Sequence, residues 1–170
     1  MPIDWKVEIS KMVYIKQVIS DLDSNKIWPH YLPKVAASNN EIKKLEKKIN
    51  KSLEHSYKEF LMHANGWQGF YQSVDLLGTN ELIYGDKIAV AFELLKETDT
   101  KSSGVYVQDL LPIGLALNDI DLFCLDLKTG NIIWFAGVEI DRFTNFEDFF
   151  LTMLDYNREE IDDLQEEMKS

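Results

Sequence analysis

Two histidines and a glutamate have the spacing of metal ligands. His55, Glu59 and His63 stand four residues apart, so on a helix they drift by only about 80° and lie near one face. Zinc is commonly bound by such side chains together with a further ligand from elsewhere in the fold. A metal-dependent hydrolase is therefore one hypothesis. The alternative, which we favour, is a solvated polar face opposite the apolar side chains of Tyr57 and Phe60, with no metal site.

Three aspartates bracket a predicted strand. Paired carboxylates can carry out acid–base chemistry or hold Mg²⁺. However, Asp121 and Asp126 are five residues apart and point to opposite faces of a strand. Asp119 and Asp121 are expected to line a loop, and Asp126 to stabilise a turn. Solvation is favoured over catalysis for this group.

The other components of common active sites are missing from the sequence. Cys124 lies inside an apolar strand, where burial raises the pKa of a thiol and makes it a small hydrophobic side chain. The glycine-rich phosphate-binding motifs GxGxxG and GxxxxGK[ST] are both missing, and there is no GxSxG nucleophile motif. The sequence therefore predicts a protein that is not an enzyme and needs no cofactor.

The segment Asn65–Tyr71 combines two glycines with three aromatic residues. Its glycines allow sharp backbone turns, so we expect a loop. Tryptophan and tyrosine are favoured anchors in protein interfaces. Trp67 and Tyr71 are thus candidate anchors for a partner, and the alternative is that one or two of the aromatic rings seal the edge of the core.

The elements that position these residues begin with helices. Apolar side chains recur at helical spacing over Asp4–Leu22, which predicts an amphipathic helix. The two prolines of Ile27–Pro33 exclude a helix interior and predict an extended connector. Ser38 and Glu41 form a capping box that begins a second helix, and a third is expected near Ser56.

Strands follow the third helix, which is expected to end at Asn65–Gly66. The predicted strands are Val74–Leu77, Leu110–Leu117 and the hairpin Asp121–Leu127 with Ile132–Ala136. Asp86–Leu95 fits a short helix. A capping box at Thr144–Glu147 predicts the start of a long last helix with one apolar and one acidic face. This order predicts an α+β fold in a single domain, residues 1–170.

Composition indicates a folded domain that contains no disulfide. The 170 residues are 45% hydrophobic and 12% aromatic, which excludes intrinsic disorder, and there is one cysteine. The first residues lack the apolar stretch of a signal peptide, and no run of residues is apolar enough to span a membrane. We therefore expect a cytoplasmic location.

Negative charge is concentrated towards the C-terminus. Residues 1–63 carry 11 Lys or Arg against 8 Asp or Glu, residues 64–138 carry 4 against 10, and residues 139–170 carry 3 against 11. The net charge of −11 repels phosphate backbones and anionic membranes and attracts basic proteins. A basic protein is therefore the expected partner, rather than nucleic acid or a membrane.

Three blocks of sequence resemble the SUKH superfamily. The first runs from Ile42 to Gly66 and is similar to the family pattern I-x-x-L-E, then L-P-x-x-Y-K-x-F-L, then N-G. Leu111–Gly114 with the following hairpin resembles the mid-chain strands, and Asn145–Phe150 resembles the closing helix. The likeness covers about residues 38–155, and residues 1–37 are a less typical helical extension.

Two positions depart from the family pattern. Glu54 stands where the family usually has proline, and Trp67 stands where a second glycine is frequent. The resemblance implies a twisted sheet flanked by N-terminal and C-terminal helices, and no enzymatic activity. It also implies a role like that of bacterial immunity proteins, which neutralise nuclease or deaminase toxins, or of the regulators of yeast cell-wall assembly.

The sequence thus predicts a protein-binding domain, most simply an immunity protein against a basic toxin. The alternative is a regulatory scaffold for an endogenous protein. The expected contacts combine the anchors Trp67 and Tyr71 with four acidic residues, Asp75, Glu81, Asp119 and Asp121.

Overall fold

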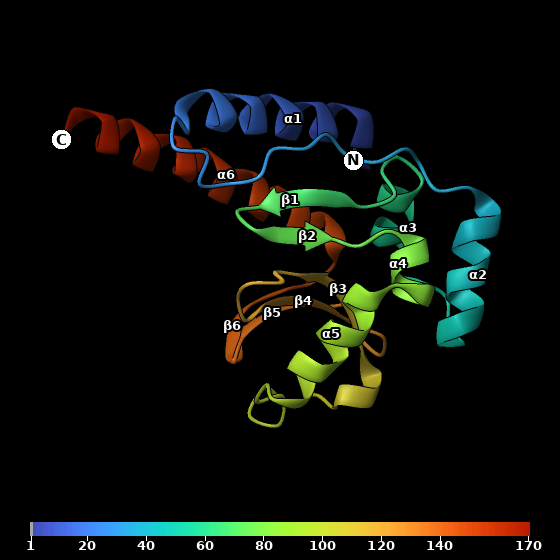
Figure 1. Cartoon of the computed structure of the whole chain (residues 1–170). Coiled ribbons are helices and arrows are strands. Elements are labelled where there is room, and N and C mark those ends of the chain that lie inside the picture. The colour runs from blue at the N-terminus through green and yellow to red at the C-terminus, as the bar shows by residue number, and fades with distance from the viewer. Residues whose placement is uncertain (1) are drawn as a thin grey trace.

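Six antiparallel strands form one twisted sheet whose spatial order follows the chain, β1 to β6 (Figure 1). The computed structural model describes residues 2–170. The strands are β1 Trp67–Tyr71, β2 Val74–Leu76, β3 Leu110–Leu115, β4 Asp121–Asp126, β5 Ile132–Ala136 and β6 Val138–Phe143. Each strand pairs with its chain neighbour, because every connection is either a short turn or, between β2 and β3, an excursion through two helices.

Helices flank this sheet, as the α+β prediction requires. They are α1 Trp5–Leu22, α2 Asn39–Ile49, α3 His55–Leu61, α4 Thr79–Tyr84, α5 Asp86–Lys96 and α6 Phe146–Lys169, with a 3₁₀ turn η1 at Val107–Asp109. The helix α6 crosses one face of the sheet and continues beyond it, with α1 packed along its outer side (Figure 1). None of these helices, among residues 2–170, has the sustained apolar length that crossing a bilayer requires.

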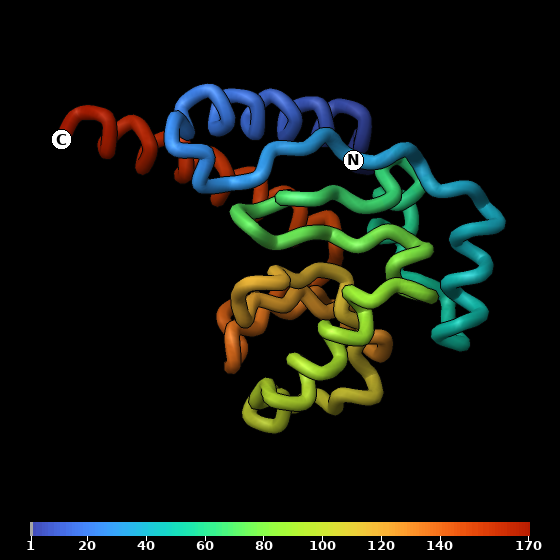
Figure 2. The backbone as a smooth tube through the Cα atoms, viewed as in Figure 1, coloured from blue at the N-terminus to red at the C-terminus, as the bar shows by residue number. Residues whose placement is uncertain are grey.

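The connector between α1 and α2 protects the free edge of β1. In the tube view it runs back along that edge (Figure 2). The Trp67 indole N–H donates to the carbonyl of Tyr31 at 2.9 Å, and the Lys34 N–H donates to the carbonyl of Gly66 at 3.0 Å. These bonds fasten the connector at the start of β1, where it covers an edge that could otherwise pair with another chain.

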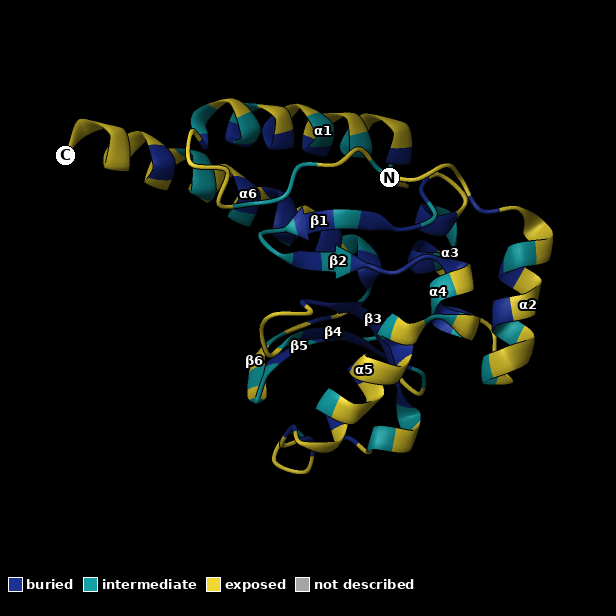
Figure 3. Ribbon diagram, viewed as in Figure 1, coloured by how far each residue is buried: buried dark blue, intermediate teal, exposed yellow. Residues whose placement is uncertain are grey.

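The core lies between α6 and the sheet and is built from aromatic rings. Phe149 packs edge-on against Phe123 of β4, with ring centroids 4.9 Å apart, and Phe150 packs against Trp5 of α1 at 5.2 Å. Trp5 is only 2% exposed, so the N-terminal helix belongs to the same core as the sheet. The central strands β3 and β4 are buried along almost their whole length (Figure 3), whereas β6 is not.

Glu54 holds the beginnings of two helices together. Its carboxylate accepts the backbone N–H groups of Ser56 and Tyr57 at 3.0 and 2.9 Å, which caps α3. The same carboxylate accepts the N–H of Phe146, the first residue of α6, at 3.3 Å. A negative charge is favourable at the N-termini of α3 and α6, because the first N–H groups of a helix have no partner within it. Glutamate, where the family usually has proline, thus contributes a cap that proline lacks.

Several boundaries differ from the sequence predictions. The third helix ends at Leu61, before Asn65–Gly66, and the segment predicted as a loop contains strand β1. The cap of the last helix is Asn145, whose side chain accepts the N–H of Asp148 at 2.9 Å, rather than Thr144. Strand β6 and helix α4 were not predicted. Charged residues in β6 disguise its pattern, because it is a half-exposed edge strand.

Lys16 is an unusual cation inside the α1–α6 interface. It is 1% exposed, and burial lowers its pKa to about 8, although the nearby carboxylate of Glu160 opposes this change. The unfolded chain therefore holds a proton between about pH 8 and 10.5 that the folded chain has released. Unfolding takes up a proton in this range, so stability rises with pH across it.

We expect Lys16→Met to be more stable than wild type at pH 7, because the buried charge is gone. The advantage should shrink by about 3 kcal/mol between pH 8 and 10.5, as wild type loses its own penalty. Urea denaturation across this range measures the difference. The exposed Lys11→Met is the matched control, and a pH-independent gap for Lys16→Met would contradict the assignment.

Glu54→Ala is expected to lower the free energy of unfolding by about 2 kcal/mol, because it removes the shared cap of α3 and α6. Glu54→Gln keeps one acceptor oxygen, so its free energy of unfolding should lie between those of wild type and Glu54→Ala. Glu59→Ala on the same helix alters only an exposed contact with His55 and should change stability by less than about 0.5 kcal/mol. Equal losses from Glu54→Ala and Glu59→Ala would contradict the role of Glu54.

Candidate protein-binding surface

Three aromatic rings from distant parts of the chain meet at one end of the sheet. Tyr71 ends β1, Trp134 lies in β5, and Tyr156 lies on α6. The ring centroids are 5.9 Å apart for Tyr71–Trp134, 6.1 Å for Trp134–Tyr156 and 6.2 Å for Tyr71–Tyr156. All three side chains are only partly buried, so this cluster offers aromatic surface to a partner.

Carboxylates surround the three rings. Asp121 accepts the Trp134 indole N–H at 2.7 Å, and Asp141 accepts the Tyr156 hydroxyl at 3.4 Å. Glu160 accepts the amide of Gln72, which follows Tyr71 in the turn after β1. We call this set the aromatic–acidic patch; it comprises Tyr71, Trp134 and Tyr156 with Asp121, Asp141, Glu159 and Glu160.

The tyrosine pKa values report a negative field at the patch. Burial, with the charges of Glu160, Glu159 and Asp121, raises the pKa of Tyr71 to about 12. The pKa of Tyr156 is also raised, first by burial and then by Asp141 and Glu159. The carboxylates thus disfavour the additional negative charge of an ionised tyrosine. By the same electrostatics they favour a positive charge brought by a partner.

The acidic groups of the patch lack close cations of their own. Within residues 2–170, no Lys or Arg lies within salt-bridge distance of Asp121, Asp141, Glu159 or Glu160. Lys16 is the nearby cation that acts on Glu160, and it is buried beneath the surface. The charge at the surface is therefore available to a basic partner.

The structure places Tyr71 and Asp121 together in this patch but separates the other predicted contacts. Trp67 is fully buried against Phe70, with ring centroids 5.8 Å apart, so its prediction as an exposed anchor is wrong. Its indole fixes the connector beside β1. The pairing of β1 is irregular between Trp67 and Tyr71, where Gly69 has φ +63°, and this lets Trp67 and Phe70 both lie inside the core. Asp119 lies in the exposed turn before β4, two residues from Asp121, where it accepts the N–H of Ile120.

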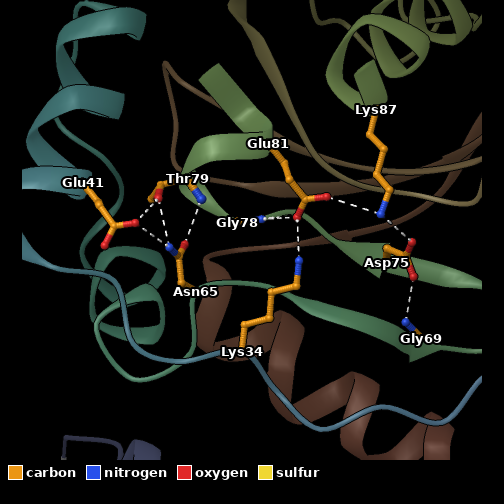
Figure 4. Close-up of polar contacts among 9 residues, drawn as sticks. All are labelled: Lys34, Glu41, Asn65, Gly69, Asp75, Gly78, Thr79, Glu81 and Lys87. Atoms are coloured by element: carbon orange, nitrogen blue, oxygen red, sulfur yellow. Dashed lines mark hydrogen bonds and ion pairs between the residues drawn. The ribbon is translucent and has the colours of Figure 1, made fainter. Parts of the chain in front are cut away.

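Asp75 and Glu81 lie in a different cluster, where two lysines neutralise them (Figure 4). The Lys87 ammonium is 3.3 Å from a carboxylate oxygen of each, and Lys34 is 3.3 Å from Glu81. Burial alone would raise the pKa of Glu81, but the Gly78 N–H, Lys87 and Lys34 outweigh it and lower the pKa. These carboxylates hold α4 and α5 to the sheet and are poor candidates for partner contacts.

A second polar network holds the Asn65–Gly66 pair in place (Figure 4). The Asn65 side chain accepts the Thr79 N–H at 2.8 Å and donates to Glu41 of α2 at 3.2 Å. Gly66 has φ +98°, and a Cβ there would lie 2.8 Å from the nitrogen of Gly78. The N-G motif thus joins α2 to the start of α4, which is a structural role.

Trp134, Tyr156 and the acids Asp141, Glu159 and Glu160 were not predicted as site residues. One signal was available in the sequence. Tyr156 stands seven residues after Phe149 and Glu160 four after Tyr156, so all three share one face of the last helix. For Trp134 the predicted hairpin of β4 and β5 placed it near Asp121, but its contacts with Tyr71 and Tyr156 depend on the packing of β1 and α6.

His55, Glu59 and His63 do not form the arrangement that the metal-site hypothesis requires. The helix α3 ends at Leu61, so His63 leaves the helical face and its ring nitrogen contacts the carbonyl of Glu59 at 2.8 Å. Across residues 2–170, no group of three or more His, Cys, Asp or Glu side chains could hold a metal ion. Cys124 is fully buried, and burial raises the pKa of its thiol.

Lys87→Met should lower the free energy of unfolding by about 1–2 kcal/mol at pH 7, since two partly buried carboxylates lose their shared cation. The gap from wild type should shrink in acid, because the contribution of Glu81 is lost as pH falls through its lowered pKa. Thermal or urea unfolding measures both effects. The exposed pair Lys96–Glu93 supplies the control, Lys96→Met, which should change stability by less than about 0.5 kcal/mol.

Comparison with known proteins agrees with this architecture. The profile of the SMI1 / KNR4 family (SUKH-1) matches residues 36–152, from just before α2 into the first half of α6. A search of curated proteins found no match. The matched region covers more than half of the 170 residues and contains the whole sheet. The chain therefore belongs to the SMI1 / KNR4 family (SUKH-1).

Proposed function

We propose that this protein is an immunity protein that binds a basic toxin domain through the aromatic–acidic patch. The observation that supports this most directly is the set of four carboxylates around three half-buried rings, none of them within salt-bridge distance of Lys or Arg in residues 2–170. Membership of the family and a net charge of −11 agree with the proposal.

The patch suits a surface rich in arginine or lysine. Guanidinium groups pair with carboxylates and also stack on aromatic faces, so both components of the patch recognise the same side chain. Nuclease and deaminase toxins bind nucleic acid and need positive charge at their active clefts. A complex formed here would cover that positive charge and block access of the substrate.

The negative field also acts before contact. Charges of opposite sign raise the rate of encounter, and salt screens this effect over about 10 Å. Speed matters for an immunity protein, because it must engage the toxin before the substrate does. The function requires no chemistry from the chain.

The double variant Asp121→Lys/Glu159→Lys should lose most of its protection when it is co-expressed with a toxin domain encoded beside its gene. Its association rate with the purified toxin should fall at least about tenfold at low salt, since two of the steering charges are reversed. Growth rescue and stopped-flow mixing at about 50 and 300 mM salt provide the two measurements.

The matched control is Glu93→Lys/Glu97→Lys, which changes the net charge equally on exposed positions of α5 and the residue that follows it. It should retain rescue and most of the association rate. Equal losses from both double variants would show that only net charge matters. Failure of wild type to protect against or bind any neighbouring toxin would refute the immunity role and favour a regulatory scaffold for an endogenous protein.

A further inference from the structure

A row of unpaired lysines occupies the outer side of α2. Lys51, just after the end of the helix, continues the row. All five lysines are exposed, and none forms an ion pair among the described residues: Lys43, Lys44, Lys47, Lys48 and Lys51. The two glutamates of the helix are already engaged. Glu41 is bound to Ser38 and Asn65, and Glu46 accepts the N–H of Leu53 at 2.8 Å and pairs with Lys58. This lysine row is a positive surface on a protein of net charge −11.

An apolar pocket of about 300 Å³ begins beside the lysine row. Lys48 and Ile49, at the end of α2, form one wall. The others come from α4, α5, η1, β3 and the residue after β4, namely Leu82, Phe92, Val107, Gln108, Leu110, Leu111 and Leu127. Of these lining residues only Lys48 and Gln108 are polar, so the pocket suits a bulky apolar side chain.

We propose that the lysine row and this pocket form a second binding surface, for an acidic peptide segment that carries a bulky apolar residue. Lysines next to an apolar recess can hold carboxylates at the rim while one aromatic or aliphatic side chain enters the recess. Recognition of this kind combines a buried anchor with a charged rim. Complementarity identifies the partner. The lysine row favours carboxylates, the pocket favours a bulky apolar side chain, and an acidic peptide segment of this kind offers both.

Nucleic acids and membranes fit this surface less well. A phosphate backbone would satisfy the lysines but offers no aliphatic or benzyl side chain for the pocket. Nucleic acids and anionic membranes are also extended polyanions. The surface outside the lysine row carries the negative net charge of the protein, −11 in total, and repels them. A short acidic segment contacts the lysine row alone and largely avoids that repulsion, because the Debye length is only about 8 Å at physiological salt.

The second surface is separate from the aromatic–acidic patch. The helix α2 lies at the right of Figure 1, and the turn between β1 and β2, which directly follows Tyr71, lies on the opposite side of the sheet, to the left. The lining of the pocket shares no residue with the patch. A basic partner and an acidic partner could therefore be bound at the same time, and the inference does not depend on the immunity role.

Selection of random twelve-residue peptides displayed on phage tests the proposal. Wild-type protein is the target, and Lys44→Glu/Lys48→Glu/Lys51→Glu is used to remove phage that bind elsewhere. We expect enriched peptides rich in Asp and Glu around at least one Phe, Leu, Ile or Trp. A synthetic peptide of the most enriched sequence should bind the triple variant at least about tenfold more weakly than wild type, as fluorescence anisotropy would show.

Two matched controls separate this surface from net charge. Lys6→Glu/Lys26→Glu/Lys101→Glu reverses three exposed lysines elsewhere and should weaken the peptide less than about twofold. On α5, Phe92→Glu places a charge in the pocket wall and should weaken binding, whereas Val90→Glu, at an exposed position outside the pocket, should not. Unfolding temperatures of all variants exclude loss of fold as the cause.

Several results would overturn the proposal. These are enrichment of basic or uncharged peptides, no enrichment over the triple variant, and equal weakening by the two lysine triples. Tighter binding of a twelve-nucleotide single strand or of phosphatidylserine vesicles, abolished in the Lys44, Lys48 and Lys51 variant, would assign the lysine row to polyanions instead of peptides.

Discussion

The packing of α6 onto the sheet is the contact on which the rest of the structure depends. Phe149 packs on Phe123 of the sheet and Phe150 on Trp5 of α1, so the helix joins the sheet to α1. Asn157, fully buried, donates to the carbonyl of Phe70 at 3.3 Å and ties the middle of α6 to β1. The aromatic–acidic patch forms because this contact brings Tyr156 beside Tyr71.

Charge is organised on the molecule rather than spread over it. Near the middle, lysines neutralise Asp75 and Glu81 and fix α4 and α5. Among residues 2–170, the patch carboxylates at one end form no salt bridge with Lys or Arg, and the lysine row at the other end forms no ion pair. A net charge of −11 conceals this division, which gives the two ends of the protein fields of opposite sign. Binding at either end would weaken as salt increases, because salt screens the attraction between opposite charges in both cases.

Much of the fold could be predicted because local signals determined it. The capping box at Ser38 and Glu41 begins α2 as expected, and the β4–β5 hairpin lies where alternation of side chains and Gly130 placed it. The site was harder to predict, because long-range pairing creates it. Aspartates 75 and 121 looked alike in sequence, and only the position of Lys87 distinguishes a neutralised carboxylate from a free one. For Trp67 the local pattern fitted two environments, since an aromatic residue beside glycines can be an exposed anchor or a core residue.

The carboxylate of Glu54 has a consequence for synthesis of the chain. It contacts the N–H of Phe146, 92 residues later, and the hydroxyl of Ser56 accepts the N–H of Glu147. While the chain emerges from the ribosome, α3 and the strands β1 and β2 are made long before the helix α6 that covers the sheet. The apolar face of the sheet therefore stays open until nearly the whole domain has been translated, a period in which such a surface is prone to association. Completion of the core is thus a late event that depends on the last element of the chain.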